Sequence, residues 1–199
     1  EELPADDAVD VLALVEDSVT EQVLQRVDLE RAEGLRELAS YDPQSAGGVM
    51  NSELVTVPEG VRLGDAIKLI KNEGEEGEDG QGVFVLDGQD RPVGYLSFRQ
   101  LITHSIHEEV RDVMAQPVSV GIDVDQEEAA GLIQHYQLEE LAVVDGAGVL
   151  VGAISADDAL AVLEEEASED FLKLVGASAE QPTRQSITRR VWTRLPLQG

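Results

Sequence analysis

The chain has 199 residues, a formal net charge of −27 at pH 7 and no cysteine. This length and 42% hydrophobic residues suffice for one domain or two small ones, with an aliphatic core because aromatics make up only 4%. The excess of carboxylates excludes a general nucleic-acid partner and favours cations. The lack of cysteine excludes disulfides and thiolate chemistry. No apolar run of about 18 residues occurs and no basic stretch opens the chain, so we expect a soluble cytosolic protein.

The charge is unevenly distributed along the chain. Residues 179–199 hold four arginines, one glutamate and the single tryptophan, a net charge of +3, so the preceding residues carry −30. By default such a tail is a disordered basic end, but its composition also suits a helix at the cytoplasmic face of a membrane. The contrast between body and tail predicts two different roles.

Three short helices are predicted in the first 45 residues. Asp6 or Asp7 can cap the first helix. Ser18 precedes Glu21 at the capping-box spacing and can open the second, and Asp28 can open the third. Helices this short must pack against another part of the protein.

From residue 50 onward the sequence repeats itself. Residues 83–102 align without a gap on 141–160, and each copy reads as strand, helix, strand, Asp-Gly turn, strand and helix. A Gly-rich and acidic stretch at 74–82 is predicted to be a flexible loop. The identical pairs are Val85/Val143, Asp87/Asp145, Gly88/Gly146, Val93/Val151, Gly94/Gly152 and Ser97/Ser155.

This repeat resembles a tandem pair of cystathionine-β-synthase (CBS) domains. The resemblance depends on Val-Arg-Asp-Val-Met at 110–114 and on Gly-hydrophobic-hydrophobic-Ser near the end of each copy. A narrower resemblance, to MgtE-type magnesium transporters, depends on residues 41–50, 123–128 and 164–170 and on Arg-Leu-Pro at 194–196.

The resemblance implies a fold of the α+β class: a short N-terminal helical segment, a tandem pair of βαββα CBS domains and a C-terminal connecting helix. The implied boundaries are 1–46 for the end of a helical N domain, 47–108 and 109–172 for the CBS domains, and 173–199 for a plug helix that leads to the transporter's own membrane domain.

Acidic residues are spaced as a metal-binding face would require. Glu166, Glu169 and Asp170 stand at i, i+3 and i+4, so a helix places them on one side, where like charges repel. From composition alone a solvated acidic face is the better interpretation. The more specific interpretation is a Mg²⁺ site, because Mg²⁺ prefers oxygen ligands and often takes one or two carboxylates.

The resemblance implies a specific set of Mg²⁺ ligands. Asp125 can equally cap the helix that follows it, and Asp6 and Asp10 can equally serve an ordinary first turn. Gln137 and Ala161 stand where the family often has aspartate, which implies that at least one site is altered or lost. The implied ligands are Asp6, Asp10, the carbonyl of Gly47, Asp125, Glu127, Asp158, Glu166, Glu169 and Asp170.

ATP is the second ligand that the resemblance implies. In the second copy, the stretch from Ser155 to Asp158 resembles the Ser/Thr-x-x-Asp element that holds an adenosine ribose in many CBS pairs. In the first copy Ser97 is followed by Gln100 in place of the acid, which implies one nucleotide site rather than two. Asp158 therefore belongs to both predicted sites.

No catalytic constellation is found, and we infer no enzyme. His104 and His107 lack the spacing and neighbours of a metal site and are expected at an exposed helix end. The function implied is a Mg²⁺-sensing module that gates a magnesium transporter, works as a homodimer, and lies at the cytoplasmic face of the cell membrane in an integral membrane protein. Two alternatives remain: an adenine-nucleotide-sensing CBS module of another host protein, and acidity that is adaptation to high salt.

Overall fold

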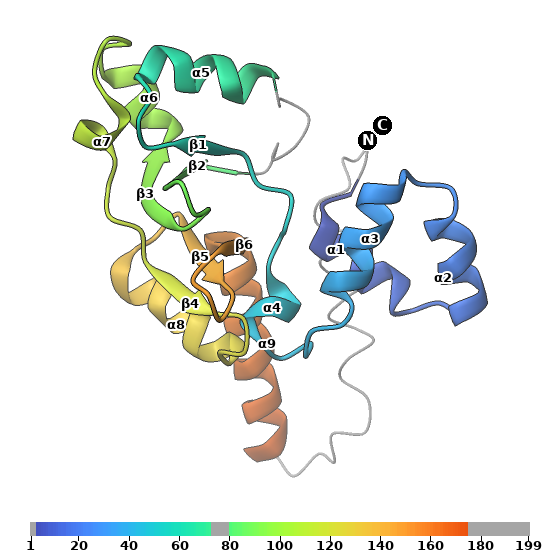
Figure 1. Ribbon diagram of the computed structural model, residues 1–199. Helices are drawn as coiled ribbons and strands as arrows, with labels where there is room; N and C mark the ends of the chain where they lie inside the picture. Colours follow the sequence, from blue (N-terminus) through green and yellow to red (C-terminus); the bar gives the residue numbers. More distant parts are fainter. Residues whose placement is uncertain (1–2, 73–79, 175–199) are drawn as a thin grey trace, which may run out of the picture.

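The computed structural model describes residues 3–72 and 80–174 (Figure 1). Most of the predicted plug helix and most of the predicted loop at 74–82 lie outside these ranges. Within them, no helix has both the length and the apolar character that a membrane span requires. The chain begins with four helices, α1 (Ala5–Leu12), α2 (Asp17–Leu24), α3 (Leu29–Leu38) and the short α4 (Ala46–Val49).

The starts of these helices differ in part from the prediction. Asp28 accepts a hydrogen bond from a backbone N–H and caps α3, as predicted. The first two helices are present, but the predictions of their capping residues are wrong. Pro4 precedes α1, so that Asp6 and Asp7 lie inside its first turn, and Glu16 precedes α2, so that Ser18 is already helical. Neither Pro4 nor Glu16 makes a side-chain cap bond, which leaves these helices dependent on tertiary packing.

The two sequence copies form two equivalent units, and the predicted order of strands and helices is confirmed. In each three-stranded sheet the first strand runs parallel to the second, and the second pairs antiparallel with the third. The first copy holds β1 (Thr56–Pro58), α5 (Leu63–Asn72), β2 (Gly82–Leu86), β3 (Pro92–Ser97) and α6 (Phe98–Thr103). After α7 (Val110–Val113) the second copy holds β4 (Ser119–Gly121), α8 (Gln126–Tyr136), β5 (Glu140–Val144), β6 (Leu150–Ser155) and α9 (Ala156–Leu174).

The predicted turns at the two Asp-Gly pairs are also present, one in each hairpin. Oδ1 of Asp87 accepts the backbone N–H groups of Gln89 and Arg91 at 2.8 and 3.0 Å. Asp145 repeats this pattern two and four residues further on, at 2.8 and 2.9 Å. A short acceptor side chain that bonds the following backbone is what makes aspartate a turn residue.

The segment that leads into each copy pairs with the sheet of the other copy. Asn51 precedes β1 and exchanges two backbone hydrogen bonds of 2.9 Å with Ala153 of β6. Ala115 precedes β4 and exchanges two hydrogen bonds of 2.9 Å with Tyr95 of β3. These crossed bridges hold the two copies together through the backbone, so that neither copy is an independent unit.

The core is aliphatic, as the composition predicts, with Phe84 the largest fully buried side chain. One cluster of buried residues lies within the first copy, and a second joins Phe84 to Ala142 and Ala153 across the two copies. The largest cluster joins the first three helices, α4 and the second copy, and includes Leu35, Met50, Ile133 and Val162. We call α1 to α3 the helical segment; its apolar side is thus continuous with the core of the second copy.

Candidate functional site

Backbone pairing brings together two of the predicted Mg²⁺ ligands, Gly47 and Asp125. Ser45 forms an antiparallel bridge with Asp125, and the N–H of Gly47 donates to the carbonyl of Ile122 at 2.9 Å. A β-carbon at position 47 would lie 2.9 Å from Cγ of Tyr41. This close approach explains why a glycine stands here, and it holds the backbone of α4 beside the start of α8.

Asp125 caps α8, so the capping interpretation is confirmed. Its Oδ1 accepts the N–H of Glu127 at 2.8 Å. Glu127 is exposed in the first turn of the helix, where negative charge is favourable to the helix dipole. A role of either carboxylate in Mg²⁺ binding stays a prediction.

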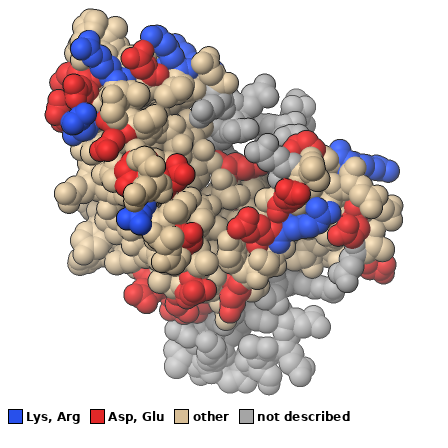
Figure 2. Space-filling model, in the orientation of Figure 1, with Lys and Arg blue, Asp and Glu red and all other residues tan. Residues whose placement is uncertain are grey.

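Helix α9 carries the densest acidic stretch of the described chain. Seven of its 19 residues are acidic and one is basic, and it packs beside α8. The stretch that holds Glu166, Glu169 and Asp170 is helical, as the predicted spacing requires; the side chains of Glu169 and Asp170 lie outside what the structure describes. Acidic side chains gather along the lower edge of the face in Figure 2, in the region that α4, α8 and α9 occupy in Figure 1.

Two more of the predicted ligands lie on α1. Asp6 and Asp10 are one helical turn apart and share a face of this helix. Asp7 between them is only 4% exposed and belongs to the interior, so a buried carboxylate stands beside the two predicted ligands. The sequence does not indicate this burial, because the first turn of a surface helix is a common place for aspartate.

The described residues do not bring these ligands into one metal cluster. Among residues 3–72 and 80–174, no group of three or more histidine or acidic side chains is close enough to hold an ion. The donor set itself is suited to Mg²⁺, since it consists of carboxylate and carbonyl oxygens. The structure therefore brings Gly47 and Asp125 together, places Glu127 in the first turn of α8, and leaves the acids of α1 on a separate helix.

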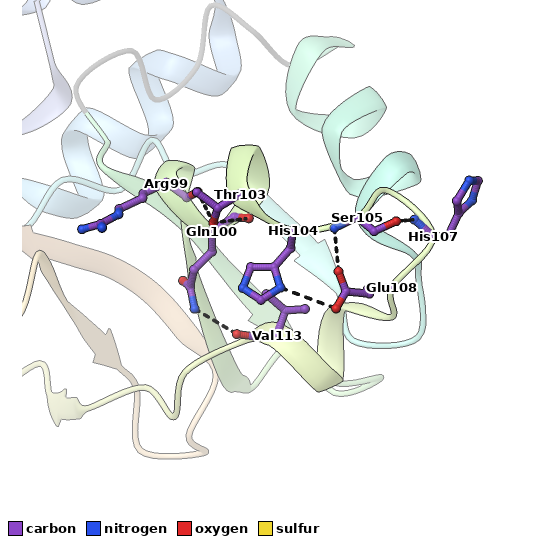
Figure 3. A network of polar contacts seen from close by, with 8 residues as sticks. All are labelled: Arg99, Gln100, Thr103, His104, Ser105, His107, Glu108 and Val113. Carbon is purple, nitrogen blue, oxygen red and sulfur yellow. Dashed lines mark hydrogen bonds and ion pairs between the residues drawn. The ribbon is translucent and has the colours of Figure 1, made fainter.

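The predicted ribose-binding elements of the two copies end in residues with different hydrogen-bond partners, Asp158 in the second copy and Gln100 in the first. Ser155 donates to Oδ2 of Asp158 at 2.5 Å, and the N–H of Asp158 donates back to the Ser155 hydroxyl at 3.1 Å. In the first copy Oε1 of Gln100 accepts the backbone N–H of Ser97 at 2.9 Å. Figure 3 shows the other contact of this side chain, in which the amide of Gln100 donates to the carbonyl of Val113 at 2.9 Å. The amide of Gln100 thus ties α6 to α7, while Asp158 offers a carboxylate at the start of α9.

The two histidines of the first copy lie in the loop after α6, exposed as predicted. Nδ1 of His104 lies 3.5 Å from a carboxylate oxygen of Glu108 (Figure 3). The other oxygen of Glu108 accepts the N–H of Ser105 at 2.5 Å. This network shapes the loop between α6 and α7.

Sequence reasoning missed a carboxylate at the junction of the two copies. Oε1 of Glu140 accepts the N–H of Gln81 at 3.0 Å, across the boundary between the copies. Burial raises the pKa of the Glu140 carboxyl, although the hydrogen bonds from Gln81 and Tyr95 act in the opposite direction. Burial and the two neighbouring glutamates also raise the pKa of the Tyr95 phenol, whose oxygen lies 3.5 Å from Oε2 of Glu139. No local pattern indicates this contact, because its members are 44 and 59 residues apart.

Gln137 and Ala161, which stand where the resemblance implies aspartate, lie at the end of α8 and within α9. Gln137 follows α8 in the left-handed conformation, with φ 52° and ψ 46°. Aspartate enters this conformation more readily than most residues, so glutamine here is less favourable for the backbone. Ala161 lies one turn after the start of α9, half-buried.

Two family models match the chain. The MgtE intracellular N domain matches residues 1–44, and the CBS domain matches twice, at 46–107 and 110–165.

Sequence relatives agree with these models. The magnesium transporter MgtE of Thermus thermophilus is 39% identical over 138 residues, which cover 69% of this chain and 31% of the relative. The magnesium transporter MgtE of Bacillus subtilis is 30% identical over 174 residues, which cover 87% and 39%. The chain thus spans 31% to 39% of the length of these relatives.

Solved structures extend the likeness to the arrangement of the domains. The cytosolic domain of the Mg²⁺ channel MgtE in complex with ATP is similar with a TM-score of 0.75 and 34% identity, over 81% of this chain and 66% of that one. The soluble part of a magnesium transporter is similar with a TM-score of 0.78 and 29% identity, over 83% and 65%. The chain therefore belongs to the CBS-domain family and corresponds to the cytosolic region of MgtE-type magnesium transporters, with the match to the N domain followed by the tandem CBS pair.

Proposed function

We propose that this chain is the Mg²⁺-sensing regulatory module that gates a magnesium transporter, and that it is not an enzyme. The observation that carries the proposal is the accumulation of like charge on two helices of the chain, α9 and α1. Seven acids lie on α9, and Asp6 and Asp10 share one face of α1. Like charges at these spacings repel and cost stability unless a cation lies between them.

The mechanism that follows is electrostatic. Bound Mg²⁺ supplies positive charge between carboxylates that otherwise repel. As this repulsion is removed, acidic groups of the helical segment and of the second copy would approach one another. These groups are Asp6 and Asp10 on the helical segment, and Asp125, Glu127 and Asp158 on the second copy. Glu166, Glu169, Asp170 and the Gly47 carbonyl complete the proposed set. The resulting compact state would move the plug helix at 173–199 and close the pore.

Several weak sites suffice for such a switch. An ion that binds only the compact state stabilises it by about 2.7 kcal/mol per site at a hundredfold excess over Kd. Moving a two-state equilibrium from 1:99 to 99:1 requires about 5.5 kcal/mol. Two sites of this kind therefore approach a near-complete response, which fits a module with more candidate carboxylates than one ion can use.

The proposed partners are a second copy of the chain and the transporter's own membrane domain, at the cytoplasmic face of the cell membrane. Two equivalent positions of the repeat support a symmetric partner. Ile102 of α6 is 83% exposed, and Leu160 of α9, which occupies the same place in the second copy, is 57% exposed. Exposed apolar side chains at matching positions are typical of an interface between copies.

A nucleotide is a second candidate ligand of the same module. The observation that favours it is the carboxylate of Asp158, held by Ser155 at the start of α9, together with the ATP complex of the similar MgtE cytosolic domain. Because Gln100 ties α6 to α7 in the first copy, the proposal is one nucleotide per chain.

Calorimetry on the 199-residue chain tests the proposal. Mg²⁺ without nucleotide should release or absorb heat and raise the unfolding temperature, whereas K⁺ at matched ionic strength should not. Replacing Glu166, Glu169 and Asp170 by alanine should weaken the response. A control with three exposed acids replaced elsewhere (Glu33, Glu59 and Asp112) should retain it.

Two results would contradict the proposal. If Mg²⁺ gives neither heat nor stabilisation, the sensing function is wrong. If K⁺ stabilises as strongly as Mg²⁺, the acidity serves salt adaptation instead. ATP added without Mg²⁺ separates the nucleotide site from the metal sites.

A further inference from the structure

Four residues meet where the first CBS copy contacts the second, and we call them the junction cluster: Gln81, Tyr95, Glu139 and Glu140. The N–H of Gln81 donates to Oε1 of Glu140 at 3.0 Å. The hydroxyl of Tyr95 lies 3.5 Å from Oε2 of Glu139 and also hydrogen-bonds to the side chain of Glu140. Two adjacent carboxylates of the second copy are thus held by groups of the first copy.

The sequence of the first copy leaves room for this contact. A β-carbon at position 82 would lie 2.6 Å from the hydroxyl oxygen of Tyr95, so glycine at the start of β2 lets the tyrosine lie across the backbone. In the second copy Glu140 takes the place of Gly82, and Ala153 takes the place of Tyr95. The cluster is therefore not repeated at the equivalent positions, and it breaks the symmetry of the two copies.

The cluster also connects the predicted ribose-binding elements of the two copies. The N–H of Phe98, at the start of α6, donates to the carbonyl of Gln81 at 3.0 Å. The N–H of Ala156, at the start of α9, donates to the carbonyl of Glu139 at 3.1 Å. Together with the bond between Gln81 and Glu140, these contacts form one path from α6 to α9. Opening of the junction would therefore loosen the first turn of α9, where the element of the second copy lies.

The protonation of Glu140 is linked to closing of the junction. Burial raises the pKa of Glu140 and repulsion from Glu139 adds to this, against the hydrogen bonds from Gln81 and Tyr95. Ser155, which pairs with Glu140 in the sheet, carries no charge. When the junction opens, water surrounds the carboxyl and its pKa returns toward the ordinary value. Closing therefore takes up a proton. This contribution to closing is complete below the ordinary pKa and is lost as the pH rises through the raised pKa.

We propose that the junction cluster is a proton-dependent link between the two CBS copies, in which protonation of Glu140 favours the closed junction and tightens nucleotide binding at the second copy. The second part of this inference rests on the proposed nucleotide site. Two effects act in the same direction there. The closed junction becomes more populated, and loss of the Glu140 charge reduces the repulsion of the nucleotide phosphates.

Hydrogen exchange at the Gln81 amide tests the link directly, because this N–H donates to Glu140 in the closed junction. Protection factors are corrected for the intrinsic exchange rate at each pH, from about pH 7.5 to about pH 5. As the pH falls, the protection factor of Gln81 should rise by up to about tenfold per pH unit, the limit for uptake of one proton. The amide of Asn51, which donates to Ala153 at 2.9 Å between the same two copies, should not rise in parallel.

Variants of the cluster give a signature that general damage to the fold would not produce. Glu140→Gln keeps an acceptor for Gln81 and should make its protection independent of pH. Glu139→Gln removes the repulsion and should lower the midpoint pH of the change in protection. Tyr95→Phe removes a hydrogen bond to the charged form of Glu140 and should raise that midpoint. Glu128→Gln, which removes an exposed charge on α8 outside the cluster, should leave it unchanged.

Calorimetric titration of ATP without Mg²⁺ gives the second readout. Because phosphate groups titrate in the same pH range, the Kd of the native chain is compared at each pH with that of Glu140→Gln. The ratio of the native Kd to the variant Kd should fall by up to about tenfold per pH unit as the pH is lowered.

The outcomes separate the link from the nucleotide site. Protection of Gln81 that does not rise as the pH falls, or that rises equally in Glu140→Gln or at Asn51, would overturn the link. So would midpoints that move in the same direction in Glu139→Gln and Tyr95→Phe. If the protection behaves as expected and the Kd ratio is constant, the link stands and its effect on the nucleotide is wrong. If ATP does not bind at all, the link stands and the proposed nucleotide site is wrong.

Discussion

Met50 packs its thioether directly on Gly152, so that a β-carbon at position 152 would overlap the methionine sulfur. Met50 leads into the first CBS copy, whereas Gly152 lies in β6 of the second. Met114, which leads into the second copy, stands in the same relation to Gly94 in β3 of the first. In each copy, the glycine of the last strand is therefore covered by the methionine that leads into the other copy. These two contacts lie beside the crossed backbone bridges.

Alanine at either glycine should destabilise the whole CBS pair. Gly152→Ala and Gly94→Ala force the methionine out of its place, and overpacking of this kind costs about 1–3 kcal/mol. Urea unfolding should show this loss in both variants. Gly131→Ala in α8 is the control, because no atom lies within 4 Å of the added β-carbon, and it should be neutral or slightly stabilising. Equal stability of Gly152→Ala and Gly131→Ala would contradict the account.

Gln137→Gly should stabilise the protein. Gln137 holds the left-handed conformation that ends α8, and this conformation costs a residue with a β-carbon about 1 kcal/mol relative to glycine. Thermal unfolding should therefore shift upward. Gln137→Ala removes the same side chain without relieving the backbone, so it should give no such gain. If both variants raise the unfolding temperature equally, the gain comes from loss of the glutamine side chain and not from relief of the backbone.

Glu140→Gln should gain stability over the native chain as the pH rises. Burial raises the folded-state pKa of Glu140, so the favourable contribution of its protonated form is complete below the unfolded pKa. That contribution is lost as the pH rises through the folded pKa. The amide of glutamine has no charge to bury. Urea unfolding between pH 4 and 7.5 should therefore show that the free energy of unfolding of Glu140→Gln increases relative to that of the native chain as the pH rises.

Asp87→Asn is the control of opposite sign. Backbone hydrogen bonds from Arg91 and Gln89 lower the pKa of Asp87, so its contribution is present above the unfolded pKa and lost in acid. The free energy of unfolding of the native chain should therefore exceed that of Asp87→Asn at neutral pH, and this difference should shrink as the pH falls. If both differences are independent of pH, neither carboxyl is perturbed as described.

Asp158→Asn should weaken ATP binding about tenfold, as loss of a hydrogen bond to a charged group commonly does. The measurement is calorimetric titration of ATP without Mg²⁺. Gln100→Asp in the first copy should not create a second site, because it removes the hydrogen bond of the Gln100 amide to Val113. A stoichiometry of two nucleotides per chain would contradict the single-site proposal.

Features of the fold that depend on neighbouring residues could be predicted from the sequence. The turns at Asp87 and Asp145 and the caps at Asp28 and Asp125 each involve groups within four residues. The start of α2 was wrong for a related reason: Ser18 has the capping-box spacing, but α2 begins one residue before it. Local patterns find such elements and often misplace their first residue.

Features that depend on crossing between the copies could not be predicted. The repeat indicates two equivalent units, but not that Asn51 pairs with the second sheet and Ala115 with the first. The contacts of Arg31 with Glu53 and of Glu140 with Gln81 likewise join residues 22 and 59 positions apart. For the candidate metal site, sequence spacing and the family resemblance supplied the carboxylates, and tertiary packing placed Gly47 beside Asp125.

Small-angle scattering of the 199-residue chain during a Mg²⁺ titration at constant ionic strength tests the central claim most directly. The account predicts a saturable decrease in the radius of gyration with Mg²⁺, no decrease with K⁺, and a weaker decrease when Glu166, Glu169 and Asp170 are replaced by alanine. A radius of gyration that does not change with Mg²⁺, or that changes equally with K⁺, would contradict it.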